Sequence, residues 1–300
     1  MLPLAFPAVP AIAGVLLALV AVGARADVVI QDDTGATVRL PQPAQRIISL
    51  APHITETLYA AGAGGHLVGS VEYSDYPEAA KKLSRIGGYS RLDLEAIANL
   101  KPDLVIGWAS GNSATHIEKL RALGIPIYLA QPERIDDVAS SLERYGELAG
   151  TQAVAGVAAS QFRDRLKDLR RQYGTRPKVR TFYQIWQQPL MTVGGTQVIS
   201  DAISLCGGEN VFADVKALAP KVSIEAVLSA DPEVIVASGM GEARPEWLDD
   251  WRQWRTMMAV KRDNLFFIPP DLIQRHTPRL VDGAAKLCAY LEVARKKRGE

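Results

Sequence analysis

The chain has 300 residues, of which 48% are hydrophobic and 22% are charged, values that are ordinary for a globular protein of one large or two modest domains. Its formal net charge of +1 gives no field that would favour nucleic acid or an anionic membrane surface. The sequence also lacks a basic stripe with interleaved aromatic residues, so no nucleic-acid partner is predicted.

The first 26 residues differ from the rest of the chain. They carry no charge before Arg25, are continuously apolar from Ala11 to Val22, and end in the small-x-small pattern Ala24-Arg25-Ala26. This pattern predicts a signal peptide, residues 1–26, cleaved after about Ala26, and therefore an exported protein. The alternative is an uncleaved anchor helix, for which the apolar run is short.

After this leader, strand and helix patterns alternate along the chain. Strands are predicted as a hairpin over 28–40 and as segments 46–50, 67–71, 104–108, 125–130, 178–186 and 264–268. Helices are predicted between Pro52 and Gly62 and over 92–100, 116–123, 197–206 and 278–297. This alternation is typical of α/β proteins with parallel sheets and helical crossovers.

The stretch from 138 to 173 contains no strong breaker pattern, and its part 153–173 has high helix propensity. Because the strand–helix order restarts directly afterwards, we predict a bridging helix within 150–175 between two α/β lobes, 27–149 and 176–300. An ordinary surface helix of one lobe is the alternative. A single packed helix between lobes would restrict their closure to small angles.

One αβ unit occurs twice, in segments 94–106 and 224–236. Each copy has a short amphipathic helix, a proline turn with an acidic residue and a buried apolar strand. The copies share Glu95 with Glu225 and Pro102 with Pro232. The duplication predicts two similar lobes, and proteins of this kind bind ligands in the cleft between them. Taken alone, each glutamate is also explained as a helix-surface residue favoured by the helix dipole.

The two cysteines of the sequence are Cys206 and Cys288. In an exported chain, two and only two cysteines predict one disulfide, and two buried free thiols are the alternative.

Sequence motifs of common enzymes and metal sites are absent. The chain has no Gly-x-Ser-x-Gly elbow, no phosphate-binding Walker loop and no His-Glu-x-x-His. Its histidines, His53, His66, His116 and His276, have no metal-ligand spacing, so we predict neither an enzyme nor a metal site. A two-lobe α/β metalloenzyme is the alternative from another class, and it would require clustered His, Asp or Cys side chains in the cleft.

Several runs resemble the periplasmic binding proteins of metal-chelate ABC importers. They are Arg46-Ile47-Ile48-Ser49-Leu50-Ala51-Pro52, Thr55-Glu56, Val68-Gly69, Tyr73-Ser74-Asp75-Tyr76-Pro77, Leu94-Glu95 and Lys101-Pro102-Asp103-Leu104-Val105-Ile106. The resemblance extends from about residue 45 to 292. It implies the class III fold of two Rossmann-like lobes joined by one helix, a periplasmic location, a monomer, and delivery of the ligand to a permease and ATPase complex in the inner membrane.

Within this family the chain is most similar to the cobalamin-binding members, through Tyr73-Ser74-Asp75-Tyr76-Pro77, Trp108, Gly111-Asn112 and the segment 206–210. The similarity implies that cobalamin or a related corrinoid is the ligand and that no further cofactor is needed. Tyr89 and Ala219 depart from the pattern, since those members carry tryptophan at both places. A haem or an iron–siderophore is the alternative ligand, and a haem site would recruit Tyr73 or His53 as the iron ligand.

A corrin requires aromatic faces and amide hydrogen bonds more than formal charge. The positions that match the family's site are Tyr73, Tyr89, Trp108, Trp186, Asp271 and Arg275. We add His53, which follows Pro52 at the end of a predicted strand and could coordinate the ligand's metal. The alternatives are core packing for Trp186, helix capping or solvent exposure for His53, and a structural ion pair for Asp271 and Arg275.

The same resemblance implies roles for two further pairs of residues. It implies that Cys206 and Cys288 form a disulfide. It also implies that Glu95 and Glu225, one on each lobe, meet arginines of the permease, which would explain why the αβ unit is repeated.

Overall fold

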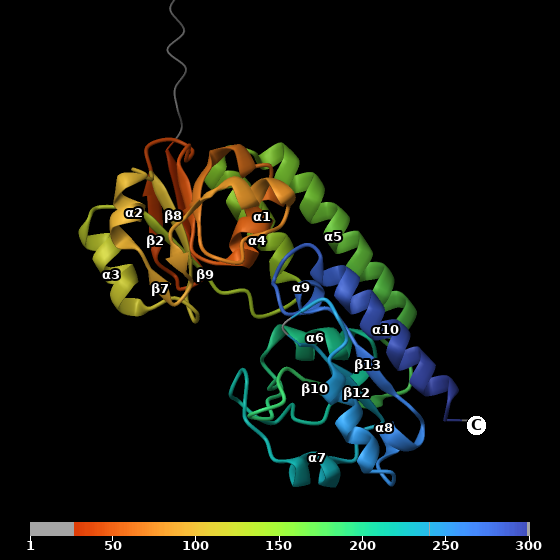
Figure 1. Cartoon of the computed structure of the whole chain (residues 1–300). Helices are drawn as coiled ribbons and strands as arrows, with labels where there is room; N and C mark the ends of the chain where they lie inside the picture. Colours follow the sequence, from red (N-terminus) through yellow and green to blue (C-terminus); the bar gives the residue numbers. More distant parts are fainter. Residues whose placement is uncertain (1–26, 240, 299–300) are drawn as a thin grey trace, which may run out of the picture.

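The computed structural model describes residues 27–239 and 241–298, so the predicted signal peptide lies outside the described residues. Figure 1 shows two lobes, each built on a sheet with helices around it, and a long helix that runs along one side of both. Both main sheets are entirely parallel, because helices or long loops connect their strands. The predicted α/β class with two lobes is confirmed.

The N-terminal lobe contains a five-stranded sheet in the order β5–β4–β3–β8–β9. Its strands are β3 (Ile47–Ser49), β4 (Leu67–Ser70), β5 (Ser84–Arg85), β8 (Leu104–Trp108) and β9 (Ile127–Ala130). Its helices are α1 (Pro52–Ala60), α2 (Leu94–Asn99), α3 (Ala114–Ala122) and α4 (Asp137–Ala149). Two antiparallel hairpins accompany the sheet, β1 (Val28–Gln31) with β2 (Thr37–Leu40), and β6 (Gly87–Gly88) with β7 (Arg91–Leu92).

The C-terminal lobe contains a four-stranded sheet in the order β11–β10–β12–β13. Its strands are β10 (Val179–Gln184), β11 (Gly208–Asn210), β12 (Val234–Ala237) and β13 (Leu265–Phe267). Its helices are α6 (Val198–Leu205), α7 (Ile224–Ala230), α8 (Met258–Lys261), α9 (Pro270–Ile273) and α10 (Leu280–Lys296), with a 3₁₀ segment η3 (Glu246–Gln253). The sequence did not predict β11, η3, α8 or α9, which are short and carry little periodic signal.

The predicted bridging helix is α5 (Gln152–Tyr173), and it packs against α1 and α4 of one lobe and α6 and α10 of the other. Its buried residues are Ala155, Ala159, Phe162 and Leu166, spaced three or four apart along one face. These residues belong to a single hydrophobic cluster that contains core residues of both lobes. The helix is therefore part of the core of each lobe rather than a free linker.

The two copies of the repeated αβ unit have the same capping and turn geometry. Asp93 caps α2 by accepting from the N–H of Ala96, and Ser223 caps α7 by accepting from the N–H of Ala226. After each helix one residue adopts a positive φ, Lys101 in the first copy and Asp231 in the second. The duplication seen in the sequence therefore corresponds to one local structure used in both lobes.

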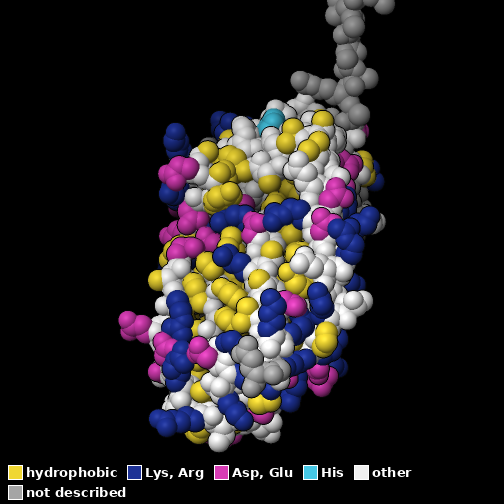
Figure 2. Space-filling model, turned by 90° about the vertical axis from the view of Figure 1, so that its right-hand side faces the viewer, with side chains coloured by type: hydrophobic (Ala, Val, Ile, Leu, Met, Phe, Trp, Pro, Cys, Tyr) yellow, Lys and Arg dark blue, Asp and Glu magenta, His cyan; other side chains and the backbone are white. Residues whose placement is uncertain are grey.

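The convex side of the molecule, where α5 and α10 lie, is shown in Figure 2. Lys and Arg side chains are interspersed with Asp and Glu side chains over this face. Ion pairs such as Arg163–Glu143 and Arg165–Asp282 connect α5 to its neighbours α4 and α10. No helix among the described residues is long and apolar enough to span a bilayer.

The predicted disulfide is confirmed, since Cys206 and Cys288 are bonded across a sequence separation of 82 residues. Cys206 lies at the C-terminal end of α6, Cys288 lies in the middle of α10, and both are fully buried. The bond joins two helices of the C-terminal lobe and leaves the contact between the lobes free.

Replacing Cys206 and Cys288 together by alanine is expected to lower the free energy of unfolding by about 4–5 kcal/mol, because the unfolded chain regains the entropy of an open loop of 82 residues. Urea denaturation of the oxidised protein and of the variant measures this difference. Reductant should lower the urea midpoint of the wild-type protein and leave the midpoint of the variant unchanged. Equal midpoints for the two oxidised samples would contradict the prediction.

Candidate functional site

A cleft between the lobes encloses about 770 Å³, including open solvent at its mouth. Both lobes contribute to its walls, which are lined by Trp108, Ser110, Gln131, Pro132, Glu133, Ile185, Thr196, Gln197, Val198, Leu218, Ala219, Gln274 and His276. Trp108 is the last residue of β8, while Gln131 and Ile185 directly follow β9 and β10. Parallel α/β sheets bind ligands at these carboxyl ends of their strands.

Trp108 is held in the cleft wall by the Gly111-Asn112 pair. A side chain at position 111 would lie 1.8 Å from the indole ring, so only glycine leaves room for it. The buried Asn112 accepts from the backbone N–H of Trp108 at 2.6 Å and donates to the carbonyls of Leu50 and Tyr89 at 3.0 and 2.7 Å. Two neighbouring residues thus fix the position of the aromatic ring and of the loop that carries Tyr89.

Tyr89 and Tyr73 differ in how they relate to this aromatic wall. The Tyr89 ring is 47% exposed and lies 6.2 Å from the Trp108 ring, so the two form one aromatic group. Tyr73 is 74% exposed and adopts a positive φ of 63° in the loop after β4. It is not among the residues that line the cleft in this structure.

His53 is buried behind the cleft, beside the lining residues Trp108 and His276, and is not itself a lining residue. It is 7% exposed, and its ring centroid lies 5.2 Å from that of Trp108 and 5.5 Å from that of His276. Burial lowers the pKa of His53 well below its usual value, and the charges of His276 and Arg275 lower it further. Burial also lowers the pKa of His276 to about 4, partly opposed by Asp137. Both imidazoles are therefore neutral near neutral pH.

The predicted pair of Asp271 and Arg275 belongs to an ionic contact that joins the lobes. Arg275 contacts Asp271 at 3.0 Å and Asp75 of the N-terminal lobe at 3.0 Å. Next to it, Arg279 donates two hydrogen bonds, of 2.7 and 2.6 Å, to the two carboxylate oxygens of Glu56, which is 2% exposed. The structure therefore gives Asp271 and Arg275 at least a structural role.

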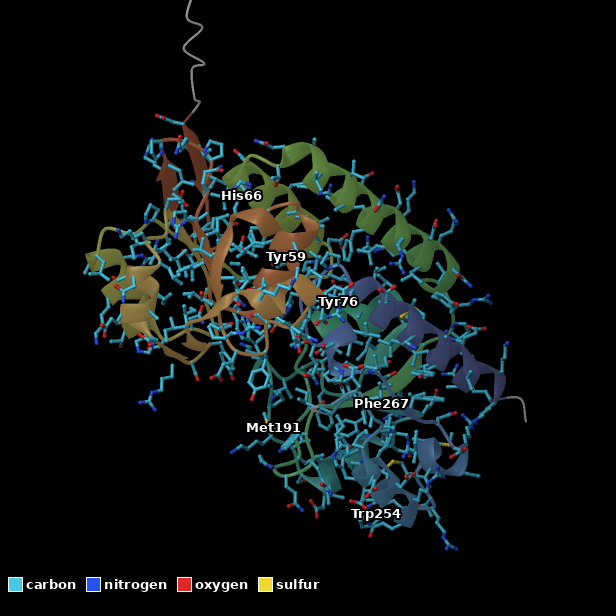
Figure 3. All side chains as sticks on the ribbon, turned by 45° about the horizontal axis from the view of Figure 1, so that its top comes forward. Tyr59, His66, Tyr76, Met191, Trp254 and Phe267 are labelled. Carbon is cyan, nitrogen blue, oxygen red and sulfur yellow. A yellow bond between two sulfur atoms is a disulfide. The ribbon has the colours of Figure 1, made fainter. Side chains whose placement is uncertain are left out.

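Tyr76 completes this contact, since its ring lies 3.8 Å from the Arg279 guanidinium carbon. Figure 3 shows Tyr76 at the junction of the two lobes. We call this group of Glu56, Asp75, Tyr76, Arg275 and Arg279 the interlobe clamp.

Trp186 does not lie at the end of a strand as the sequence suggested, because β10 ends at Gln184. Its indole N–H donates to the carbonyl of Gln188 at 3.0 Å, within a turn that Met191 closes by a bridge. Its neighbour Ile185 lines the cleft instead. Trp186 is thus adjacent to the cleft, and its indole N–H already has a partner.

A second hollow lies on the C-terminal lobe alone. Trp247, Trp251 and Trp254 of the η3 region line it together with glutamines of the turn after β10. Trp251 is itself held by a hydrogen bond of 2.7 Å to the side chain of Gln184. We take the interlobe cleft as the candidate site because residues of both lobes line it.

Sequence reasoning missed several residues of the cleft, His276 and the amides Gln131, Gln197 and Gln274 among them. The position of Gln131 directly after a strand was a usable signal, and the same rule applies to Ile185. His276 and Gln274 had no such signal, since a loop of the opposite lobe places them at the floor of the cleft.

The lining of the cleft is mainly aromatic, aliphatic and amide. Glu133 is the one charged residue among its described lining residues. Within residues 27–239 and 241–298, no group of three or more His, Cys, Asp or Glu side chains is placed to hold a metal ion. The arrangement is suited to a bulky uncharged ligand with hydrogen-bonding edges.

Glu95 and Glu225 lie outside the cleft, both exposed and both in the first turn of the repeated helix. Hydrogen bonds from its own backbone N–H and from Ser223 lower the pKa of Glu225. In Figure 1 their helices, α2 and α7, lie on different lobes, away from α5. Each lobe therefore presents one carboxylate at an equivalent place.

Residues 47–272 match the family model described as periplasmic binding protein. The vitamin B12-binding protein of Vibrio cholerae serotype O1 is 41% identical over 265 residues, which cover 88% of this chain and 95% of that protein. The vitamin B12-binding protein of Yersinia pestis is 39% identical over 250 residues, 83% of this chain and 87% of that protein.

Solved structures of periplasmic binding proteins are also similar to this chain. The periplasmic vitamin B12-binding protein BtuF of Vibrio cholerae matches with a TM-score of 0.78 and 41% identity, covering 85% of this chain and 99% of that one. The haem-binding protein RhuT of Roseiflexus matches with a TM-score of 0.71 and 24% identity, covering 84% and 99%, and shares the fold.

The low pKa of the buried His276 predicts a loss of stability in mild acid. Because the folded-state pKa of His276 is about 4 and its unfolded value is near 6.5, the unfolded chain binds more protons between these values. The free energy of unfolding should therefore fall as the pH drops from 6.5 to 4, with about 3 kcal/mol from His276.

Urea denaturation at several pH values measures this slope in the wild-type protein and in His276→Gln. The variant should lose clearly less stability over the same range, because glutamine binds no proton. Parallel curves for the two proteins would show that His276 is not the group responsible.

Proposed function

This chain belongs to the periplasmic binding protein family, and on that premise we propose that it is the substrate-binding protein of an ABC importer for cobalamin or a related corrinoid. In this proposal the chain acts in the periplasm as a monomer after removal of residues 1–26, and it binds its ligand without altering it chemically. The cobalt belongs to the ligand rather than to a resident cofactor. The partners are the permease and ATPase complex of the inner membrane.

The observation that carries the proposal is the chemistry of the interlobe cleft. A corrin offers a broad face and a rim of amide side chains, and the cleft offers Trp108, with Tyr89 beside it, and the amides Gln131, Gln197 and Gln274. Aromatic faces and amides recognise such a ligand without formal charge. The relatives that are 39–41% identical to this chain over most of its length are named for the same ligand.

Ala219 and Tyr89 adjust this cleft to its ligand. Ala219 lines the rim with a methyl group, and Tyr89 adds a half-exposed ring and a hydroxyl. Where the cobalamin-binding members carry tryptophan, this chain therefore has less aromatic area and more space. We propose that it accepts a smaller or differently substituted corrinoid.

Haem and iron–siderophores remain ligands to be tested against the corrinoid. Haem carries two carboxylates and many ferric siderophores carry acidic groups, for which cationic side chains are the natural partners. The described lining of the cleft has Glu133 as its charged group, and Arg275 and Arg279 are engaged with carboxylates of the interlobe clamp. This distribution of charge favours the uncharged corrin.

Delivery to the permease is proposed to use Glu95 and Glu225. Both side chains are exposed, and they lie at equivalent positions of the repeated unit, one on each lobe. A partner built from two similar halves can present one arginine to each carboxylate. Since α5 is packed into the core of both lobes, we expect the spacing of the two carboxylates to change little when ligand binds.

Calorimetric titration of the 27–300 protein with cyanocobalamin tests the ligand. We expect one site with a submicromolar Kd, a free energy beyond about −8 kcal/mol. Replacing Trp108 by alanine should weaken binding by about 2 kcal/mol, roughly 30-fold, because an aromatic face of the cleft is lost. Trp247→Ala, which removes a tryptophan from the hollow of the C-terminal lobe, is the matched control and should leave the Kd unchanged.

Haem and a ferric hydroxamate serve as parallel titrants in the same experiment. Binding of either one with no heat from cyanocobalamin would keep the family and assign a different ligand. If the Trp108→Ala variant binds with the wild-type Kd, Trp108 does not contact the ligand and the proposed site is wrong.

Replacing Glu95 and Glu225 together by alanine should abolish uptake of the ligand while its Kd stays unchanged, because both residues lie outside the cleft. Transport by the reconstituted importer and calorimetry on the isolated protein measure the two quantities. The control is Glu118→Ala with Glu246→Ala, again one exposed glutamate from each lobe. If the control pair impairs uptake equally, or the first pair weakens ligand binding, the docking role is wrong.

A further inference from the structure

Two imidazoles that are far apart in the sequence meet at the junction of the lobes. His53 is the second residue of α1 in the N-terminal lobe, and His276 lies between α9 and α10 in the C-terminal lobe. Their ring centroids are 5.5 Å apart. The hydroxyl of Thr57 donates to the carbonyl of His276 at 3.5 Å, so α1 also contacts the backbone that carries the second ring.

One of these two rings has a buried nitrogen without a partner. Nε2 of His53 is inaccessible to solvent and has no hydrogen-bond partner, and the same holds for the hydroxyl of Thr277, the residue after His276. A buried polar atom without a partner costs about 1–3 kcal/mol, so native proteins seldom leave one. The unpartnered nitrogen of His53, with a second imidazole close by, indicates that a further polar species can be bound there.

The two rings meet edge to face at an interplanar angle of 67°, and the distance between their centroids is that expected for a metal ion held by one nitrogen of each. A metal–imidazole bond is about 2.0–2.1 Å, which places the ion roughly 3.2 Å from each ring centroid. Centroids 5.5 Å apart then correspond to an angle of roughly 120° between the two bonds. This angle lies near the tetrahedral and trigonal arrangements that zinc and similar ions adopt.

We propose that His53 and His276 form a binding site for a divalent transition-metal ion of the kind that prefers imidazole, such as Zn²⁺, Ni²⁺ or Cu²⁺, which joins the two lobes beside the cleft. Neutral imidazole is the form that binds such ions, and burial keeps both rings neutral. The site is independent of the corrinoid proposed above.

Two protein ligands make a weaker site than the three or four of a resident metal centre. We therefore expect micromolar affinity, and an ion that is exchangeable rather than structural. Since one ligand comes from each lobe, bound metal stabilises the arrangement of lobes seen here. Any ion that binds only the folded protein raises its stability in proportion to RT ln(1 + [metal]/Kd).

The test uses the tag-free 27–300 protein after treatment with a chelator. Calorimetric titration with zinc chloride and nickel chloride at neutral pH should give one site with a micromolar Kd, and the melting temperature should rise with metal. His53→Gln and His276→Gln should each weaken binding at least tenfold. The control is His66→Gln with His116→Gln, which removes two imidazoles elsewhere; Figure 3 shows His66 in the N-terminal lobe away from the junction.

Cobalt chloride supplies a second readout, since the visible absorption of Co²⁺ reports its ligands and coordination number. The wild-type protein and the control should give the same bands, and the His53 and His276 variants should lose them. Circular dichroism tests whether each variant is folded. If His53→Gln does not fold, the folded His276→Gln variant is sufficient for the test.

Three results would overturn the proposal. They are no zinc or nickel binding by the wild-type protein, unchanged binding by the folded His276→Gln variant, or loss of binding in the His66 and His116 control. Titration with cyanocobalamin in metal-free buffer is a separate experiment, so a failure of the corrinoid and a failure of the metal site are distinguishable.

Discussion

The buried ion pair between Glu56 and Arg279 determines how the lobes sit against each other. Burying two charges is unfavourable unless they are paired with good geometry, and removing one partner of such a pair typically costs 3–5 kcal/mol. Here two hydrogen bonds join the charges, and Tyr76 covers the guanidinium. Any large rotation of one lobe would have to break this pair, so the cleft is expected to be largely formed before ligand arrives.

The bridging helix acts in the same direction as the clamp. α5 buries one face in a core that both lobes share, so it cannot bend as a free linker would. A clamp at the junction and a stiff helix along the convex side leave only small changes in the angle of the cleft. We therefore expect the cleft to respond to a ligand by small shifts of its rim rather than by closure of the lobes.

What the sequence predicted well is local. The short helices, the proline turns and the apolar strands of each copy lie within a few residues of one another, so the repeated unit and the two lobes were predicted from the sequence. The helix α5 was predicted from the high helix propensity of residues 153–173. The clamp and the pair of histidines could not be predicted, because Glu56 and Arg279, or His53 and His276, come together only after both lobes have folded and docked. The same limit applies to Trp186, whose position depends on where β10 ends.

α10 connects these long-range features into one mechanical unit. Arg279 of the clamp is the N-cap residue of this helix, and Cys288 in its middle is bonded to Cys206 at the end of α6. The other end of α6 begins with Val198, which lines the cleft together with the cap residue Gln197. The disulfide thus joins α6, which contributes to one wall of the cleft, to α10. Arg279, at the start of α10, contacts the opposite lobe. The disulfide lies within one lobe, yet through α6 and α10 it supports the geometry of the cleft between both lobes.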